Sequence, residues 1–202
     1  MSRSILPSPM AGRILTAGFP TKKTVKLRYC QEISLSISSG YMAYHGFRLN
    51  SLFDPDYTST GHQPLGFDQW AAIYDKYCVT RAAISCRSTH GDKAAYDPIM
   101  MGIHIQQGDT FAQPPSAMAD FAEHNDNSRL VGPLSALPAG DNSGTMTAKQ
   151  VVDVAKLAAT KDLIGNADWI APVANNPTEV VWGSVCIYAP AIATDTYTFP
   201  FF

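Results

Sequence analysis

The sequence contains no apolar run that approaches the length of a membrane span. Its N-terminus also lacks the continuous apolar stretch of a secretory signal. We therefore expect a soluble chain that does not insert into membranes and is not secreted by the classical route. The 202 residues show no internal repeat and no long linker. One β-rich domain is the natural interpretation, because sandwiches and barrels of this size often form a single unit.

Cysteine is scarce and never closely paired. The four cysteines form no C-x-x-C motif, and alternation places each of them within an expected strand: Cys30, Cys78, Cys86 and Cys186. Free cysteine is among the most buried residue types, so packing in the core is the favoured role. An intracellular assembly site would keep the thiols reduced. A disulfide stays open, because the sequence cannot assign one.

Motifs for catalysis or cofactor binding are also missing. The five histidines form no H-E-x-x-H motif and no close pair, there is no G-x-S-x-G, and no glycine-rich loop has the spacing of a phosphate or dinucleotide site. We therefore assign no catalytic residue, no cofactor and no metal, and expect that the chain is not an enzyme. For His62, which precedes Gln63 and Pro64, a hydrogen bond to local backbone is the favoured role.

Four aspartates near the middle of the chain could gather carboxylates around one loop: Asp54, Asp56, Asp68 and Asp75. Subunit interfaces of some proteins hold calcium between such groups. Their spacing, however, matches no defined calcium loop such as an EF-hand. Turn formation and helix capping are therefore the favoured roles.

Acidic residues are absent before Glu32, which divides the charge of the chain. The first thirty residues carry +6, whereas the remaining nine basic and seventeen acidic residues leave −8. A basic arm on an acidic body indicates a nucleic acid or a membrane surface as partner. The candidate nucleic-acid-binding residues are Arg3, Arg13, Lys22, Lys23, Lys26 and Arg28. The alternative is that residues 22–28 form the solvated face of the first strand, where Val25 and Leu27 alternate with Lys26 and Arg28.

Strand patterns dominate what is present. Strict alternation at residues 33–38 predicts a half-buried strand, and Cys78 to His90 alternates in the same way. The expected strands are 21–38, 41–53, 78–90, 99–106, 129–131, 145–152, 179–188 and 194–202. Eight strands are the number in a jelly roll, so we expect an all-β, eight-stranded antiparallel jelly-roll sandwich at residues 21–202. Residues 1–20 would form an extended, weakly basic arm.

Short helices are expected only in connections. Trp70, Ile73, Tyr74 and Tyr77 stand at helical spacing and predict a helix at residues 67–77, with Asp68 as its N-cap and the aromatic side chains in the core. Residues 117–123 predict a second short helix capped by Ser116. Residues 151–159 are ambiguous. Val151, Val154, Ala155 and Ala158 have helical spacing. A strand that ends near Asp153 and is followed by a helical turn, which we favour, is what a family resemblance carried by residues 47–79 implies.

The segment at residues 47–79 carries a specific resemblance. It contains Asn50-Ser51-Leu52-Phe53-Asp54-Pro55, then Gly61-His62-Gln63-Pro64, then Gly66-Phe67-Asp68-Gln69-Trp70 with Tyr74 and Tyr77. This pattern resembles the signature of capsid proteins from circular single-stranded DNA viruses that encode a replication-initiator protein. The turn Asn175-Asn176-Pro177 before the strand at 179–188 is similar to the family as well.

The resemblance implies a structural protein of the virion. It implies self-assembly into a small icosahedral shell, most simply of sixty copies, around circular single-stranded DNA in the host nucleus. A host receptor would be a further partner. In the family a dense Arg/Lys tract neutralises the packaged DNA, whereas this chain has six dispersed cations. The end departs too, because Pro200 lies inside the last apolar run, which predicts an edge strand or a strand that stops near Phe199. Phe201 and Phe202 would then form a subunit contact.

Two other functions of a jelly roll stay open. A carbohydrate-binding, lectin-like module would show exposed aromatic side chains on one sheet face with carboxylates beside them. An enzyme of the cupin type would need clustered histidine and glutamate ligands, which the sequence does not supply.

Overall fold

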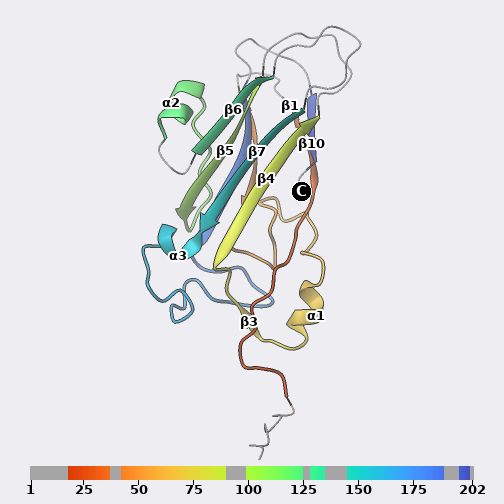
Figure 1. The fold of residues 1–202 in the computed structure, drawn as a ribbon, viewed down its shortest axis with the longest axis vertical. Helices are drawn as coiled ribbons and strands as arrows, with labels where there is room; N and C mark the ends of the chain where they lie inside the picture. Colours follow the sequence, from red (N-terminus) through yellow and green to blue (C-terminus); the bar gives the residue numbers. More distant parts are fainter. Residues whose placement is uncertain are drawn as a thin grey trace, which may run out of the picture.

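The computed structural model describes residues 18–36, 42–89, 99–124, 128–134, 145–188 and 196–200. Within these residues it forms two four-stranded antiparallel sheets that pack face to face (Figure 1). Sheet A has the order β1-β10-β4-β7, and sheet B has the order β2-β9-β5-β6. The chain crosses repeatedly between the two sheets, which is the strand order of a jelly roll. The expected fold class is confirmed.

The strands of sheet A are β1 (Glu32–Ser36), β10 (Thr196–Pro200), β4 (Arg81–Thr89) and β7 (Thr145–Asp153). The strands of sheet B are β2 (Met42–Arg48), β9 (Val180–Tyr188), β5 (Ile99–Gly108) and β6 (Ser128–Leu134). A separate pair, β3 (Lys76–Tyr77) and β8 (Ala171–Pro172), lies beyond one end of the sandwich (Figure 1).

The core fills the space between the sheets. Ile84 from sheet A and Ile103 and Val185 from sheet B are among its buried side chains. Each is a β-branched residue at an inward position of an alternating strand, where such side chains pack well. Burying one of them stabilises the fold by about 1.5–3 kcal/mol. Period-two alternation is therefore a sound guide to these strands.

Three short helices lie in the described parts of the connections: α1 (Phe67–Ala71), α2 (Met118–Glu123) and α3 (Val154–Leu157). The split of residues 151–159 is confirmed, because β7 ends at Asp153 and its side chain caps α3 by accepting from the Lys156 N–H. The cap predicted at Ser116 is wrong, since Ala117 occupies the N-cap of α2 without a side-chain bond. In the described part of the chain, no helix is long and apolar enough to cross a membrane.

Two predicted strands end differently. The first strand begins at Glu32 rather than at residue 21, because the chain before it packs against a loop instead of a neighbouring strand. β10 is an inner strand between β1 and β4, not an edge strand. Pro200 is tolerated as its last residue, opposite Glu32 and beyond the pairing of Thr198 with Thr89. Phe201 and Phe202 lie outside the described residues.

The four cysteines do not share one environment. Cys86 and Cys186 are buried in strands, as predicted. Burial raises the pKa of the Cys86 thiol to about 12, which keeps it neutral and unreactive. Neither Cys30 nor Cys78 lies in a strand, so the predicted strand position is wrong for both. Cys78 is half-buried and still packs against the core, whereas Cys30 is exposed, so packing in the core is wrong only for Cys30.

Candidate functional site

The segment that carries the motif is organised around one buried carboxylate. Asp56 follows β2 and is fully buried. Its oxygens accept hydrogen bonds from the Gln31 amide (2.7 Å), the Thr58 backbone N–H (2.8 Å) and the Thr58 hydroxyl (2.9 Å). The His45 Nε2 lies 3.0 Å away and forms an ion pair when the ring is protonated. Asp56 thus joins the segment before β1, strand β2 and the following loop.

The electrostatics of this carboxylate favour its charged form. Burial alone would raise the pKa of Asp56. The hydrogen bonds from Thr58 and Gln31, together with the charge of His45, outweigh burial and hold the pKa below its usual value. Burial, and after it the charge of Asp56, raise the pKa of Tyr29 to about 12. The aspartate acts here as a structural anion.

Arg48 ties the same loop to the outer face of sheet B. Its guanidinium donates to the Asp54 carboxylate (2.8 Å) and to the backbone carbonyl oxygens of Asp54, Asp56 and Tyr57 (3.2, 2.6 and 3.3 Å). It also lies 5.2 Å from the ring centroid of Trp182, within range of a cation–π interaction. Arg48 is therefore an internal tie. The expectation that the aspartates form turns fits Asp54 and Asp56.

The two motif segments that are far apart in sequence meet in space. The Asn50 side chain is buried, donates to the Glu179 carbonyl and accepts from the Val181 N–H, both at 2.8 Å. Next to it, the Ser51 hydroxyl donates to the Asn176 side-chain oxygen at 2.6 Å. These bonds fasten the end of β2 to the turn before β9, so the Asn residues of both segments have a structural role.

His62 fixes the segment before β1. Its Nδ1 lies 2.7 Å from the Gln63 carbonyl oxygen and its Nε2 lies 2.8 Å from the Cys30 carbonyl oxygen. A ring that faces two acceptors is best satisfied when both nitrogens carry protons, and these bonds raise the pKa of His62. The predicted bond to local backbone is confirmed, and the bond to Cys30 is an addition that the sequence did not indicate.

Helix α1 is shorter than predicted and presents an apolar end to solvent. It begins after Gly66, whose φ of 87° favours glycine, so the N-cap predicted at Asp68 is wrong. Phe67 is buried and packs edge-on against Tyr77, which belongs to β3. Trp70 and Tyr74 are only half-buried, which corrects their assignment to the core.

Three large apolar side chains of this region are exposed: Leu65 at 90%, Phe19 at 74% and Ile73 at 40%. We name them the α1 patch. Tyr74 holds the chain near Phe19 in place, because its hydroxyl donates to the Pro20 carbonyl at 2.9 Å. Exposed apolar residues held on an ordered scaffold are typical of protein contact surfaces.

The predicted nucleic-acid contacts are partly described. Arg3 and Arg13 lie outside the described residues. Lys22, Lys23, Lys26 and Arg28 are exposed and lie in the segment 18–31, which forms no strand, so the alternative of a solvated strand face is wrong in that form. The bonds to Pro20 and Cys30 hold this segment against residues 61–74. The nucleic-acid role of these residues stays a prediction.

The outer face of sheet B is covered by the connection between β5 and β6. Phe111 lies so close to Gly46 that a Cβ there would be 2.7 Å from its ring, and Phe121 of α2 approaches Gly102 in the same way at 2.6 Å. Phe121 packs on Tyr188 with ring centroids 5.3 Å apart. The described part of this face is therefore a second small core rather than an open aromatic platform, which does not favour a lectin-like site.

The histidines do not gather into a ligand set within the described residues. His104 and His124 have ring centroids 5.2 Å apart, where burial and the neighbouring ring lower the pKa of His104. His45 and His62 belong to the motif segment, and His90 lies outside the described residues. No group of three or more His, Cys, Asp or Glu in the described ranges is placed to hold a metal ion.

No family model and no curated protein matches the sequence. Solved structures similar to the chain include one from broad bean stain virus, at 10% identity and a TM-score of 0.40, covering 89% of this chain and 86% of that chain. A second is from Desmodium yellow mottle tymovirus, at 10% identity and a TM-score of 0.37, covering 99% and 91%. A third is an empty virus-like particle of cowpea mosaic virus, at 10% identity and a TM-score of 0.37, covering 90% and 82%. These likenesses are loose, and the jelly roll rests on the strand order of this chain.

Proposed function

We propose that the chain is a capsid subunit that assembles with copies of itself into a small closed icosahedral shell of roughly sixty subunits. The shell would enclose circular single-stranded DNA. Under this proposal the protein is structural rather than enzymatic, resides in the virion, and assembles in the host nucleus. A host receptor would bind the outside of the shell.

One observation carries the proposal: the motif residues of a jelly roll build a rigid support for an exposed apolar surface. Asp56, Arg48 and Asn50 fix the loop that follows β2, and Leu65 and Ile73 of the α1 patch come next along the chain. Closed shells require surfaces that meet at fixed angles, and a rigid sandwich with firmly held loops meets this requirement.

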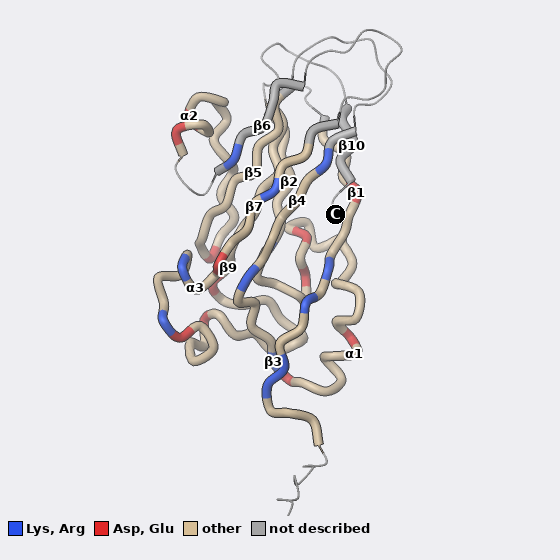
Figure 2. Tube along the Cα trace, viewed as in Figure 1, with Lys and Arg blue, Asp and Glu red and all other residues tan. Residues whose placement is uncertain are grey.

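The nucleic-acid part of the proposal concerns the N-terminal cations. Lys22, Lys23, Lys26 and Arg28 are exposed, and Figure 2 shows basic residues along the segment that precedes β1. With Arg3 and Arg13 they would contact phosphates on the inner side of the shell. Six dispersed cations neutralise few phosphates, so we expect little nucleic acid in particles formed by the protein alone.

The test is the assembly state of the purified full chain, measured by size-exclusion chromatography with negative-stain microscopy. We expect uniform hollow particles without any added cofactor. Each subunit should bury well above about 1,000 Å² in its contacts, as stable interfaces do. A monomer that persists across the salt and pH conditions tested would refute the proposal.

A further inference from the structure

The outer face of sheet A carries basic residues that are not among the six nucleic-acid-binding residues predicted near the N-terminus. In β4, Ile84 and Cys86 are buried in the core, so alternation turns Arg81 and Arg87 outward, and both are exposed. In β7, Ala148 is buried and Lys149 is exposed on the same outer face. The alternation of β4 was visible in the sequence, but it did not say that β7 lies beside β4.

The register brings two of these cations together. Arg87 lies opposite Thr147, and Ser85 lies opposite Lys149. Arg87 and Lys149 are therefore diagonal neighbours, a relation in which the backbones of the two residues are about 7–8 Å apart. Their cross-strand partners, Thr147 opposite Arg87 and Ser85 opposite Lys149, have small side chains. The surface between the two charges is therefore low enough for an extended chain to lie on the strands.

A third cation approaches from the edge of the sandwich. The Arg129 guanidinium of β6 donates to the Lys149 carbonyl oxygen at 3.3 Å. Figure 2 shows Lys and Arg positions on β4, β7 and β6 on the side of the molecule that faces the viewer.

Among the described residues, no carboxylate forms an ion pair with Arg87 or Lys149. The ion pairs found among the described residues are His45–Asp56 and Arg48–Asp54, and both belong to the loop after β2. Acidic residues on the described strands of sheet A are Glu32 and Asp153. Glu32 is in β1, which β10 separates from β4, whereas Asp153 caps α3 and lies opposite Arg81 in the register. In the part of this face that the structure describes, Arg87 and Lys149 are exposed and their charge is open to solvent.

We infer that the outer face of sheet A binds the phosphates of a single-stranded nucleic acid through Arg87 and Lys149, and so forms the inner surface of the shell. This assignment rests on the proposed function, because the face would enclose a nucleic acid only if the subunits form a closed shell. A nucleic acid fits better than a membrane, since the described outward side chains of β4 and β7 include no Trp or Tyr of the kind that anchors proteins at lipid headgroups. Phosphate contacts alone imply binding that is independent of sequence and sensitive to salt.

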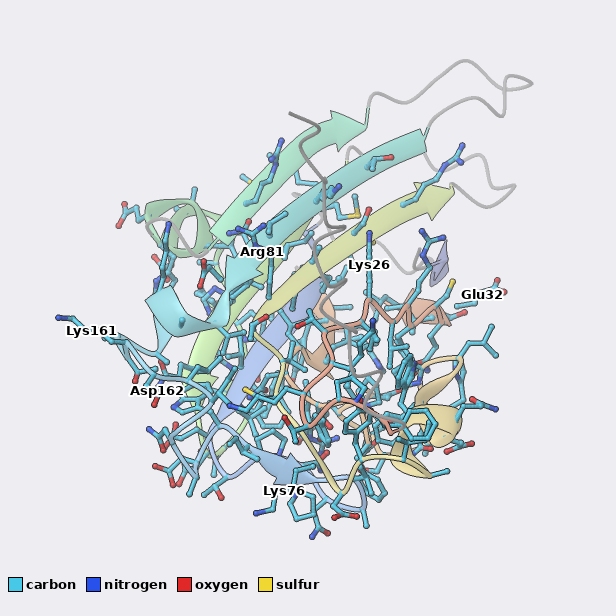
Figure 3. All side chains as sticks on the ribbon, turned by 60° about the horizontal axis from the view of Figure 1, so that its bottom comes forward. Lys26, Glu32, Lys76, Arg81, Lys161 and Asp162 are labelled. Atoms are coloured by element: carbon cyan, nitrogen blue, oxygen red, sulfur yellow. The ribbon has the colours of Figure 1, made fainter. Side chains whose placement is uncertain are left out.

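The experiment compares two variants that remove the same charge. R87Q/K149Q changes the face, whereas K76Q/K161Q removes two exposed lysines that lie away from β4 and β7 (Figure 3). Binding of a fluorescent oligothymidylate to the full chain is measured by anisotropy over a range of salt concentrations. The face variant should bind several-fold more weakly, and its salt slope should fall by about 1.4, which is about 0.7 for each lost phosphate contact. The control should bind almost as the parent does.

Three results would overturn the assignment. Equal weakening of both variants would mean a general effect of net charge, and unchanged binding by R87Q/K149Q would place the contacts elsewhere. A third variant, K22Q/K23Q, shows whether the segment before β1 is that place. If R87Q/K149Q lost the binding to phosphatidylserine vesicles that the parent shows but kept its binding to the oligonucleotide, the face would bind membranes instead. Particle formation is scored separately by microscopy, so a failure of assembly is distinguished from a failure of this face to bind.

Discussion

At the scale of single residues, the buried carboxylate of Asp56 has a structural role. Asp56 has features that mark many functional carboxylates: burial, a histidine partner and a shifted pKa. All of its partners, however, hold backbone segments together, and the shift favours the charged form that accepts their hydrogen bonds. A buried charge with full partners fixes one arrangement of the loop, and it would be costly in any other arrangement.

Removing this carboxylate should destabilise the fold. In Asp56→Ala the donors of Gln31, Thr58 and His45 lose their acceptor, and the free energy of unfolding should fall by about 3 kcal/mol. Asp68→Ala, which changes an exposed aspartate, should stay within about 0.5 kcal/mol of the parent. Chemical denaturation of the three proteins measures both values.

The pH dependence of the same proteins gives a second readout with a definite sign. The folded pKa of Asp56 is lowered, so its stabilisation is present above the unfolded pKa of about 3.9 and is lost as the pH falls through the folded pKa. Below about pH 4 the stability of the parent should fall more steeply than that of Asp56→Ala. If the free energies of unfolding of the parent and of Asp56→Ala changed in parallel with pH, the carboxylate would not be held in its charged form.

At the scale of elements, helix α1 shows where periodicity misled. The apolar spacing at residues 70–77 fits a helix, but Tyr77 of β3 pairs with Ala171 of β8 and its hydroxyl donates to the Asn175 carbonyl. These partners lie about a hundred residues away, so no local pattern could indicate them. The tertiary contacts outweigh helix propensity, which is a weak preference.

The anchor of α1 is therefore Phe67 rather than Trp70. Phe67→Ala should lower the free energy of unfolding by about 3–5 kcal/mol, because the side chain is buried against Tyr77. Trp70→Ala removes a half-buried ring that contacts Tyr74 with centroids 6.1 Å apart, and its effect should be clearly smaller. Thermal and urea unfolding of the two variants would show the order. The opposite order would return Trp70 to the core.

At the scale of the whole molecule, alternation of apolar residues predicted the fold because each strand buries one face. The sites were less predictable. The sequence indicates local turn roles for Asp54 and His62, but it does not indicate the distant contacts of this region. Gln31 lies 25 residues from its partner Asp56, and Cys30 lies 32 residues from its partner His62. The cations of β4 and β7 become one surface only through strand order, which the sequence does not contain.

The last prediction separates the subunit contact from the inner face of the shell. In L65S/I73S two exposed apolar side chains of the α1 patch become polar, so the isolated subunit should keep its stability within about 1 kcal/mol. Assembly should fail, because each contact would lose the burial of side chains worth about 1.5–3 kcal/mol apiece, repeated around the shell.

Val151→Ser is the matched control, since Val151 is 56% exposed on the outer face of sheet A and is proposed to face the interior. It should assemble normally. Size-exclusion chromatography reports assembly, and thermal unfolding confirms that each variant is folded. If L65S/I73S formed normal particles, the α1 patch would not be a contact. If Val151→Ser were the variant that stayed monomeric, sheet A would form the subunit contact and could not also line a cavity filled with nucleic acid.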